Sequence, residues 1–138
     1  MSKRRRGEVL VLGIVALAAL APAASQPRDP KKALAHDQLG LARQALGDLD
    51  RMYKGGEVTR YDPRFAVWER RQVEAVRDAG ASRAEFIAAL EGYAKRLGDW
   101  QRIVEEGYRK DQVSRVDVHD AKYRVLEAEI WLIQEKAR

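Results

Sequence analysis

A run of apolar residues with alternating spacings of four and three constrains the fold of this chain more than any other feature. The run consists of Phe86, Leu90, Tyr93, Leu97, Trp100 and Val104. This spacing places all six side chains on one side of a helix, as in the seam of a coiled coil. A seam of this kind needs a second apolar surface to cover it. The pattern therefore predicts a helix that packs along its length against a neighbouring helix.

A second run near the C-terminus supplies that neighbour. Its members are spaced three and four residues apart and are Val118, Ala121, Val125, Ala128 and Leu132. They predict a helix from about Arg115 to Glu135 that packs against the first seam across the Lys110–Ser114 turn. Each seam covers about two or three heptads, a length that suits a packed hairpin or a small bundle.

The preceding part of the chain predicts two more helices. One runs from Asp29-Pro30, an N-cap followed by proline at the first helical position, to about Lys54 before Gly55-Gly56. The other covers about Pro63–Asp78. We expect their apolar faces to consist of Leu34, Leu41, Ala45, Leu49 and Met52 in the first helix and of Phe65, Trp68, Val73 and Val76 in the second. No long stretch alternates polar and apolar residues, so the predicted class is all-α, with two tandem helix–loop–helix hairpins.

The N-terminal segment has the layout of a secretory signal peptide. A basic stretch up to Val9 precedes an uncharged apolar run, Val9–Leu20, and small residues follow it up to Ser25. This run of about 12 residues is shorter than the roughly 20 that span a bilayer as a helix. We therefore divide the chain into a signal peptide at 1–25, a linker at 26–29 and a helical domain at 30–138. The alternative is an uncleaved signal anchor that uses residues 9–20.

The helical domain contains an internal repeat, which we place at 30–79 and 82–137. At an offset of 55 residues, six of the 22 pairs from Tyr53/Tyr108 onwards are identical. Such self-similarity indicates a duplicated helix–loop–helix unit. The repeated polar residues suit helix capping, and the predicted caps are Asp29, Thr59 with Asp62, Ser82 with Glu85, and Ser114 with Asp117. In the first copy, Asp62-Pro63 is an alternative cap and first helical position.

Composition excludes several classes of function. Residues 1–25 carry four basic side chains and one acidic side chain, so they hold +3 of the net charge of +5. The remaining chain interleaves acids with bases, which does not suit a nucleic-acid interface. There is no cysteine, and His36 and His119 are the only histidines. We therefore predict no catalytic residues, no metal ligands and no cofactor, and hence a protein that is not an enzyme.

One surface is a candidate for interaction with a partner. If the helices alternate in direction, the two repeated loops lie at the same end of the domain. They would bring together Tyr53, Lys54, Arg60, Arg64, Tyr108, Arg109, Lys110 and Arg115. Acidic residues of the same loops reduce the net charge of this group. A solvated helix end is therefore one interpretation, and a docking surface for an anionic partner or a membrane headgroup is the other.

The repeat resembles the tandem helical repeats of the TolC-like outer-membrane efflux family over about 22 residues in each copy. The second copy carries Tyr108, Val113, Ser114, Asp117, Val118, Ala121, Leu126, Ala128 and Glu129 of that pattern. The first copy has Pro63 where the second has Val118, and Asp111 stands in place of the family's glycine. The resemblance implies an exported α-hairpin that assembles side by side with others. It does not imply a complete channel, because the chain shows no series of barrel strands.

Two functional hypotheses follow. The first is an exported, non-catalytic helical-hairpin protein of the periplasm or cell envelope that acts by protein–protein contact or self-association, linked to TolC-like assemblies. The second is a periplasmic sensor or ligand-binding module, with His119 and nearby carboxylates as metal ligands. Neither hypothesis involves nucleic acid, and the membrane takes part only if the signal is not cleaved.

Overall fold

The computed structural model describes residues 29–138, which form four helices and contain no strand. The helices are α1 (Pro30–Lys54), α2 (Arg64–Asp78), α3 (Arg83–Arg109) and α4 (Arg115–Lys136). The predicted all-α class with about four helices is confirmed. The predicted signal peptide and most of the linker lie outside these residues.

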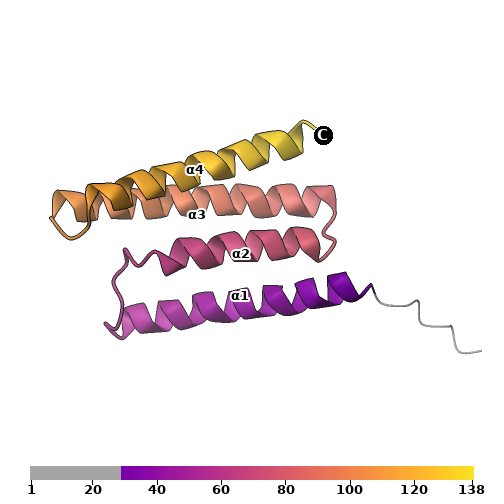
Figure 1. Cartoon of the computed structure of the whole chain (residues 1–138), viewed down its shortest axis with the longest axis horizontal. Coiled ribbons are helices and arrows are strands. Elements are labelled where there is room, and N and C mark those ends of the chain that lie inside the picture. The colour runs from indigo at the N-terminus through magenta and orange to yellow at the C-terminus, as the bar shows by residue number, and fades with distance from the viewer. Residues whose placement is uncertain (1–28) are drawn as a thin grey trace, which may run out of the picture.

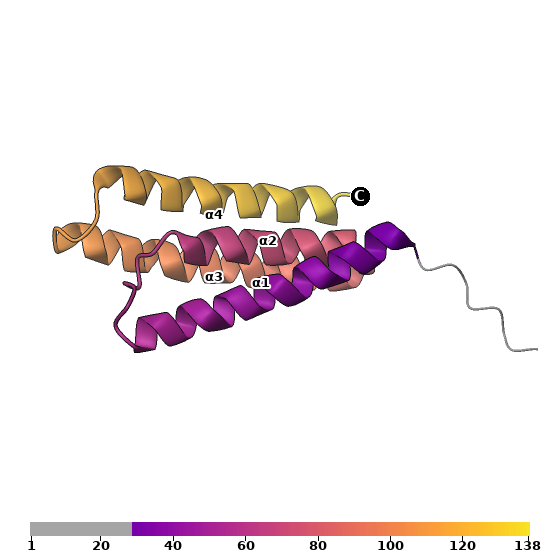
Figure 2. The ribbon, with the colours of Figure 1, turned by 60° about the horizontal axis from the view of Figure 1, so that its bottom comes forward.

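The helices alternate in direction and pack in chain order (Figure 1). The main contacts join α1 to α2, α2 to α3, and α3 to α4. Two views 60° apart both place α1 and α4 at opposite edges of the molecule (Figure 2). The α1–α2 and α3–α4 loops lie at one end, while the α2–α3 loop and the C-terminus lie at the other. Each edge helix therefore has one face toward its neighbour and one face away from the protein.

The core follows the seam of α3. Leu90, Tyr93, Leu97 and Val104 are fully buried, and Trp100 is nearly so. They pack with Val118, Ala121 and Ala128 of α4 and with Ala66 and Val73 of α2. The predicted pairing of the two seams is confirmed, with Phe86, Val125 and Leu132 only partly buried. Small alanines in α4 leave room for the large aromatic side chains of α3, which is how facing helices reach native packing density.

The predicted apolar face of α1 is wrong in part. Leu34 and Leu41 are 66% and 60% exposed, whereas Ala35, Ala42 and Leu49 are buried. Because α1 packs mainly against the single helix α2, only a narrow stripe is covered. Alanines in that stripe allow the two helices to approach closely, and the leucines one position earlier point away from the contact.

Three helices begin at side-chain caps. The Asp29 carboxylate accepts a hydrogen bond from the Lys31 backbone N–H at 3.0 Å. At α3 the Ser82 hydroxyl accepts from the Glu85 N–H, and the Glu85 carboxylate accepts from the Ser82 N–H. Ser114 and Asp117 make the same reciprocal pair at the start of α4, with distances of 3.2 and 2.7 Å. These bonds satisfy backbone donors that the first turn of a helix leaves without partners.

The prediction that Thr59 caps the second helix is wrong. Helix α2 begins at Arg64, one residue later than expected. Its N-cap residue is Pro63, which provides no side-chain capping hydrogen bond. Asp62 instead accepts a hydrogen bond from the Arg64 N–H at 2.9 Å. Proline occupies the place that the valine takes in the second copy, so the helix start shifts and the Thr59 hydroxyl lies too far upstream to cap it.

Candidate functional site

The two repeated loops meet at one end of the protein. Tyr61, in the α1–α2 loop, donates a hydrogen bond from its hydroxyl to the side-chain carbonyl of Gln112 in the α3–α4 loop. The ring of Tyr61 lies against Gly107 near the end of α3, where a Cβ atom would be only 2.7 Å from the ring. Neither Gly107 nor Gln112 could be predicted from the sequence, because their contacts depend on how the first loop folds back onto α3.

Left-handed residues shape both loops. Gly56 has a φ of +76° and Asp111 has a φ of +56°. The two residues are equivalent positions in the two copies of the repeat. Glycine adopts it without steric cost, and aspartate adopts it more readily than most other residues.

The eight residues of the predicted interaction surface all lie at this loop end, but their charges are largely matched. Lys54 pairs with Asp50 at 2.6 Å, and Arg64 pairs with Asp62 at 2.7 Å. The Glu106 carboxylate forms ion pairs with Lys110 at 2.7 Å and with Arg60 at 3.9 Å. Within residues 29–138, Arg109 and Arg115 form no ion pair. Tyr53 and Tyr108 are each a little over 40% exposed.

The acidic partners are held in their charged form. The hydrogen bond from the Arg64 side chain is the main cause of a lowered pKa at Asp62. The hydrogen bond from Lys110 lowers the pKa of Glu106, with a smaller contribution from Arg60. Each carboxylate therefore neutralises a neighbouring cation at ordinary pH. The loop end does not focus a positive field of the kind that attracts an anionic partner.

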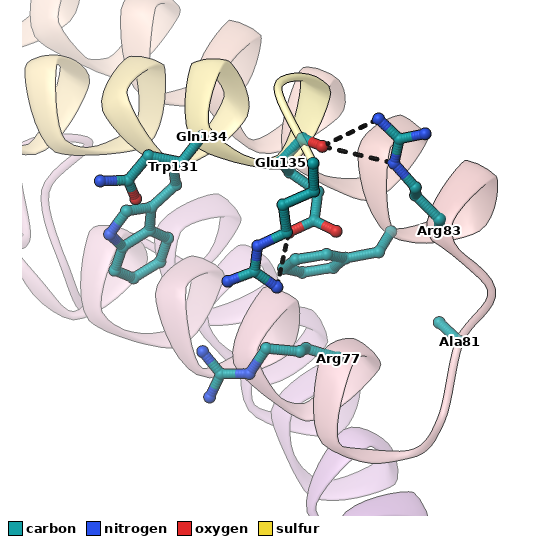
Figure 3. Close-up of a pocket in the computed structure, with 8 residues that line it drawn as sticks. Arg77, Ala81, Arg83, Trp131, Gln134 and Glu135 are labelled. Carbon is teal, nitrogen blue, oxygen red and sulfur yellow. Dashed lines mark hydrogen bonds and ion pairs between the residues drawn. The ribbon is translucent and has the colours of Figure 1, made fainter.

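A cavity of about 320 Å³ lies at the opposite end, between the ends of α2 and α4 and the start of α3 (Figure 3). Arg83 lies at its edge and donates to the backbone carbonyls of Glu135 and Lys136 at 3.1–3.4 Å. Arg77 is bonded to Asp78, and Arg138 is paired with Glu135. The arginines around the cavity are thus engaged with the protein, and Arg83 caps the C-terminal carbonyls of α4.

A polar cluster joins α2 to α4 across the middle of the molecule. Arg70 binds Glu74 at 3.1 Å and Glu127 at 2.8 Å, and its guanidinium lies 5.0 Å from the ring centre of Trp131. The ring of Tyr93 stacks on that of Trp131, with the two ring centres 6.3 Å apart. Burial raises the pKa of Tyr93 to about 12, and its hydroxyl has no hydrogen-bond partner among residues 29–138. The cluster braces three helices, and its tyrosine stays protonated at neutral pH.

In the part of the chain that the structure describes, no metal-binding group is assembled. Across residues 29–138, no three His, Asp or Glu side chains converge as ligands. His119 lies on the exposed side of α4 while Asp117 is occupied in the cap of that helix. The same residues include no helix that is both long enough and apolar enough to cross a membrane.

The outward face of α4 carries a second apolar seam, which the sequence analysis missed. Its members are spaced three and four residues apart and are Val116, His119, Tyr123, Leu126, Ile130 and Ile133. The five apolar residues are 52–73% exposed. We call this set the outer seam. At 100° per residue, it lies nearly opposite the buried seam of the same helix. The signal was present in the sequence, since both runs have heptad spacing.

Comparison of the chain with protein-family models, curated proteins and solved structures found no match in any of the three.

Proposed function

We propose that this protein is an exported, non-catalytic helical-hairpin protein of the cell envelope that acts by protein–protein contact. The outer seam of α4 is the single observation that carries the proposal. Large apolar side chains gathered on one exposed helix face are typical of a surface that another protein covers. Their heptad spacing favours a helix as the covering element.

The other surfaces support this choice of contact face. The loop end has matched charges, and the arginines of the cavity at the opposite end are bonded within the protein. The outer seam, in contrast, offers apolar area that no other part of residues 29–138 covers.

Export and the connection to TolC-like assemblies rest on the sequence. The basic and apolar segments up to Leu20 have the order of a signal peptide, and the repeat resembles the hairpins of that family. We propose cleavage near Ala24–Gln26, which an intact-mass measurement of the exported protein tests. A full mass of 15.7 kDa in the membrane fraction would show that residues 9–20 act as an anchor instead.

Site-specific photo-crosslinking in cells that make the protein tests the contact. A photoreactive phenylalanine analogue replaces Tyr123 on the outer seam, and a matched variant carries it at Arg102, an exposed position on α3. We expect a heavier protein adduct from position 123 and little from position 102. Equal yields at both positions, or no adduct at position 123, would overturn the proposal.

A further inference from the structure

We propose that the outer seam of α4 binds the outer seam of a second copy of this chain, with the two α4 helices parallel and in register. This inference rests on the proposed function, because it names the partner of the same surface. It makes the protein a two-fold symmetric dimer in which the same residues face one another across the axis.

The position of α4 leaves space for this arrangement. Both views place α4 at the edge of the molecule, with α1 at the opposite edge (Figures 1 and 2). The buried seam of α4 faces α3, and the outer seam points nearly the opposite way. Two copies can therefore meet along α4 while their other helices lie on the far sides of the contact.

The charges beside the outer seam select the parallel orientation. In a parallel pair, Arg115 lies beside Asp120 of the second copy, and Lys122 lies beside Glu127 of the second copy. The two-fold axis repeats both attractive pairs. Asp120 and Glu127 are already bonded to Arg124 and Arg70 in their own chain at 2.7 and 2.8 Å, but a carboxylate has further acceptor sites.

The antiparallel orientation has a poorer charge pattern. When the midpoints of the two outer seams lie opposite each other, Asp120 would lie beside Glu127 of the second copy, and Arg115 would lie beside Lys136 of the second copy. Both contacts are repulsive, and only Lys122 with Glu129 is attractive. Charges beside the seam set the orientation of helix pairs, so the parallel form is favoured.

The composition of the seam also favours pairing with itself over pairing with α1. The outward face of α1 offers Leu34 and Leu41 as its large exposed apolar residues, against five on α4. Contact between α4 of one copy and α1 of the next would also leave free ends and produce an open chain of molecules. Self-pairing of α4 covers the larger apolar surface and closes after two copies.

Cysteine cross-linking tests both the partner and the orientation, since the full chain has no cysteine of its own. The first variant is Ile133→Cys, near one end of the seam, and the matched control is Arg102→Cys on the exposed side of α3. Under mild oxidation of the purified protein, we expect a disulfide-linked dimer from Ile133→Cys and little from the control. In the antiparallel form two copies of residue 133 would be about 25 Å apart, too far for a disulfide.

The other outcomes overturn the proposal in distinguishable ways. A mixture of Val116→Cys and Ile133→Cys that links only as a mixed pair would show the antiparallel form. Assemblies of more than two copies in sedimentation would show contact between α4 of one copy and α1 of the next. A monomer at all concentrations, together with photo-adducts from position 123 in cells, would show that another protein covers the seam. That last result would reject the second copy and leave the proposed function standing.

Two further variants measure the strength of the contact. Ile130→Glu places a carboxylate in the seam and should raise the dimer Kd by at least about tenfold. His119→Leu removes the one polar member of the seam and should lower the Kd by a similar factor. Sedimentation of both variants against the parent over a micromolar concentration range gives these values. A dimer that responds to neither substitution does not use this face.

Discussion

At the scale of single residues, Ser114 and Thr59 show how one proline changes the task of a hydroxyl group. They are equivalent in the two copies of the repeat, but only Ser114 caps a helix. Pro63 delays the start of α2, and the carboxylate of Asp62 takes over the nearby backbone donor. Sequence equivalence therefore does not guarantee equivalent hydrogen bonds.

This difference gives a matched pair of substitutions. Ser114→Ala removes the acceptor for the Asp117 N–H and should lower the free energy of unfolding by about 1 kcal/mol. Thr59→Ala removes no capping bond and should change it by less than about 0.5 kcal/mol. Urea unfolding of both variants measures the difference. Equal losses at the two positions would contradict the assignment of the caps.

The capping carboxylates also predict a response to acid. The hydrogen bonds from Ser82 lower the pKa of Glu85, and those from Ser114 lower the pKa of Asp117. The unfolded chain lacks these bonds, so it takes up protons at a higher pH than the folded protein. The stability they contribute is therefore present above the ordinary carboxyl pKa of about 4 and is lost as pH falls below it.

Glu85→Gln combined with Asp117→Asn tests this response. The amides remove the two titrating groups, and we expect the thermal midpoint to fall less between pH 5 and pH 2, about the range in which paired carboxylates are protonated. Thermal melts of the variant and the parent across this range provide the measurement. Parallel declines in the two proteins would show that other carboxylates dominate the acid response.

At the scale of the elements, Gly107 is where the first hairpin meets the second. Its hydrogen leaves room for the ring of Tyr61, and a methyl group there would lie 2.7 Å from that ring. Gly107→Ala should therefore cost about 1–3 kcal/mol through overpacking, although alanine favours helix. Gly98→Ala, in open space on the same helix, should instead stabilise by up to about 1 kcal/mol.

A double substitution shows whether the Tyr61 ring is the cause. In a Tyr61→Ala background, the added Gly107→Ala change should no longer destabilise the protein, because the obstructing ring is gone. Chemical unfolding of the single and double variants completes the cycle. An undiminished cost of Gly107→Ala in that background would place the strain elsewhere.

The difference in burial predicts different outcomes for two leucines. Leu97 is buried in the core, so Leu97→Ala should cost about 2–5 kcal/mol. Leu34, on the outward face of α1, is 66% exposed, and Leu34→Ala should change stability by less than about 0.5 kcal/mol. Thermal melts of dilute protein compare the two. A Leu97→Ala variant that melts like the parent would rule out the intramolecular seam.

At the scale of the whole molecule, periodicity identified the helices and the α3–α4 pairing but not every buried face. In α1, Leu34 with Leu41 and Ala35 with Ala42 have the same seven-residue spacing, so spacing alone could not tell which pair faces α2. In α4, two interleaved runs have heptad spacing, and the one with smaller residues is buried. Which of two such faces is buried depends on which helices pack beside it in the fold, and a single sequence does not specify these.

The candidate site was less predictable than the fold for the same reason. The alternation of helix direction correctly predicted that the two loops lie at one end of the protein. The ion pairs of the cations there depend on the rotamers of neighbouring acidic side chains, which the sequence does not give. The outer seam was hidden because its residues match a core pattern, and only the edge position of α4 leaves them exposed.

The central claim is that α4 packs through one face and presents an apolar contact surface on the other. The thermal midpoint of dilute protein carrying either Ile130→Glu or Ala128→Glu tests it most directly. Ala128 is fully buried, so a carboxylate there should lower the midpoint severely. Ile130→Glu should leave the midpoint of the dilute protein nearly unchanged, because that residue faces solvent in the single copy. An equally severe loss from Ile130→Glu would show that the outer seam is part of the core and would contradict the account.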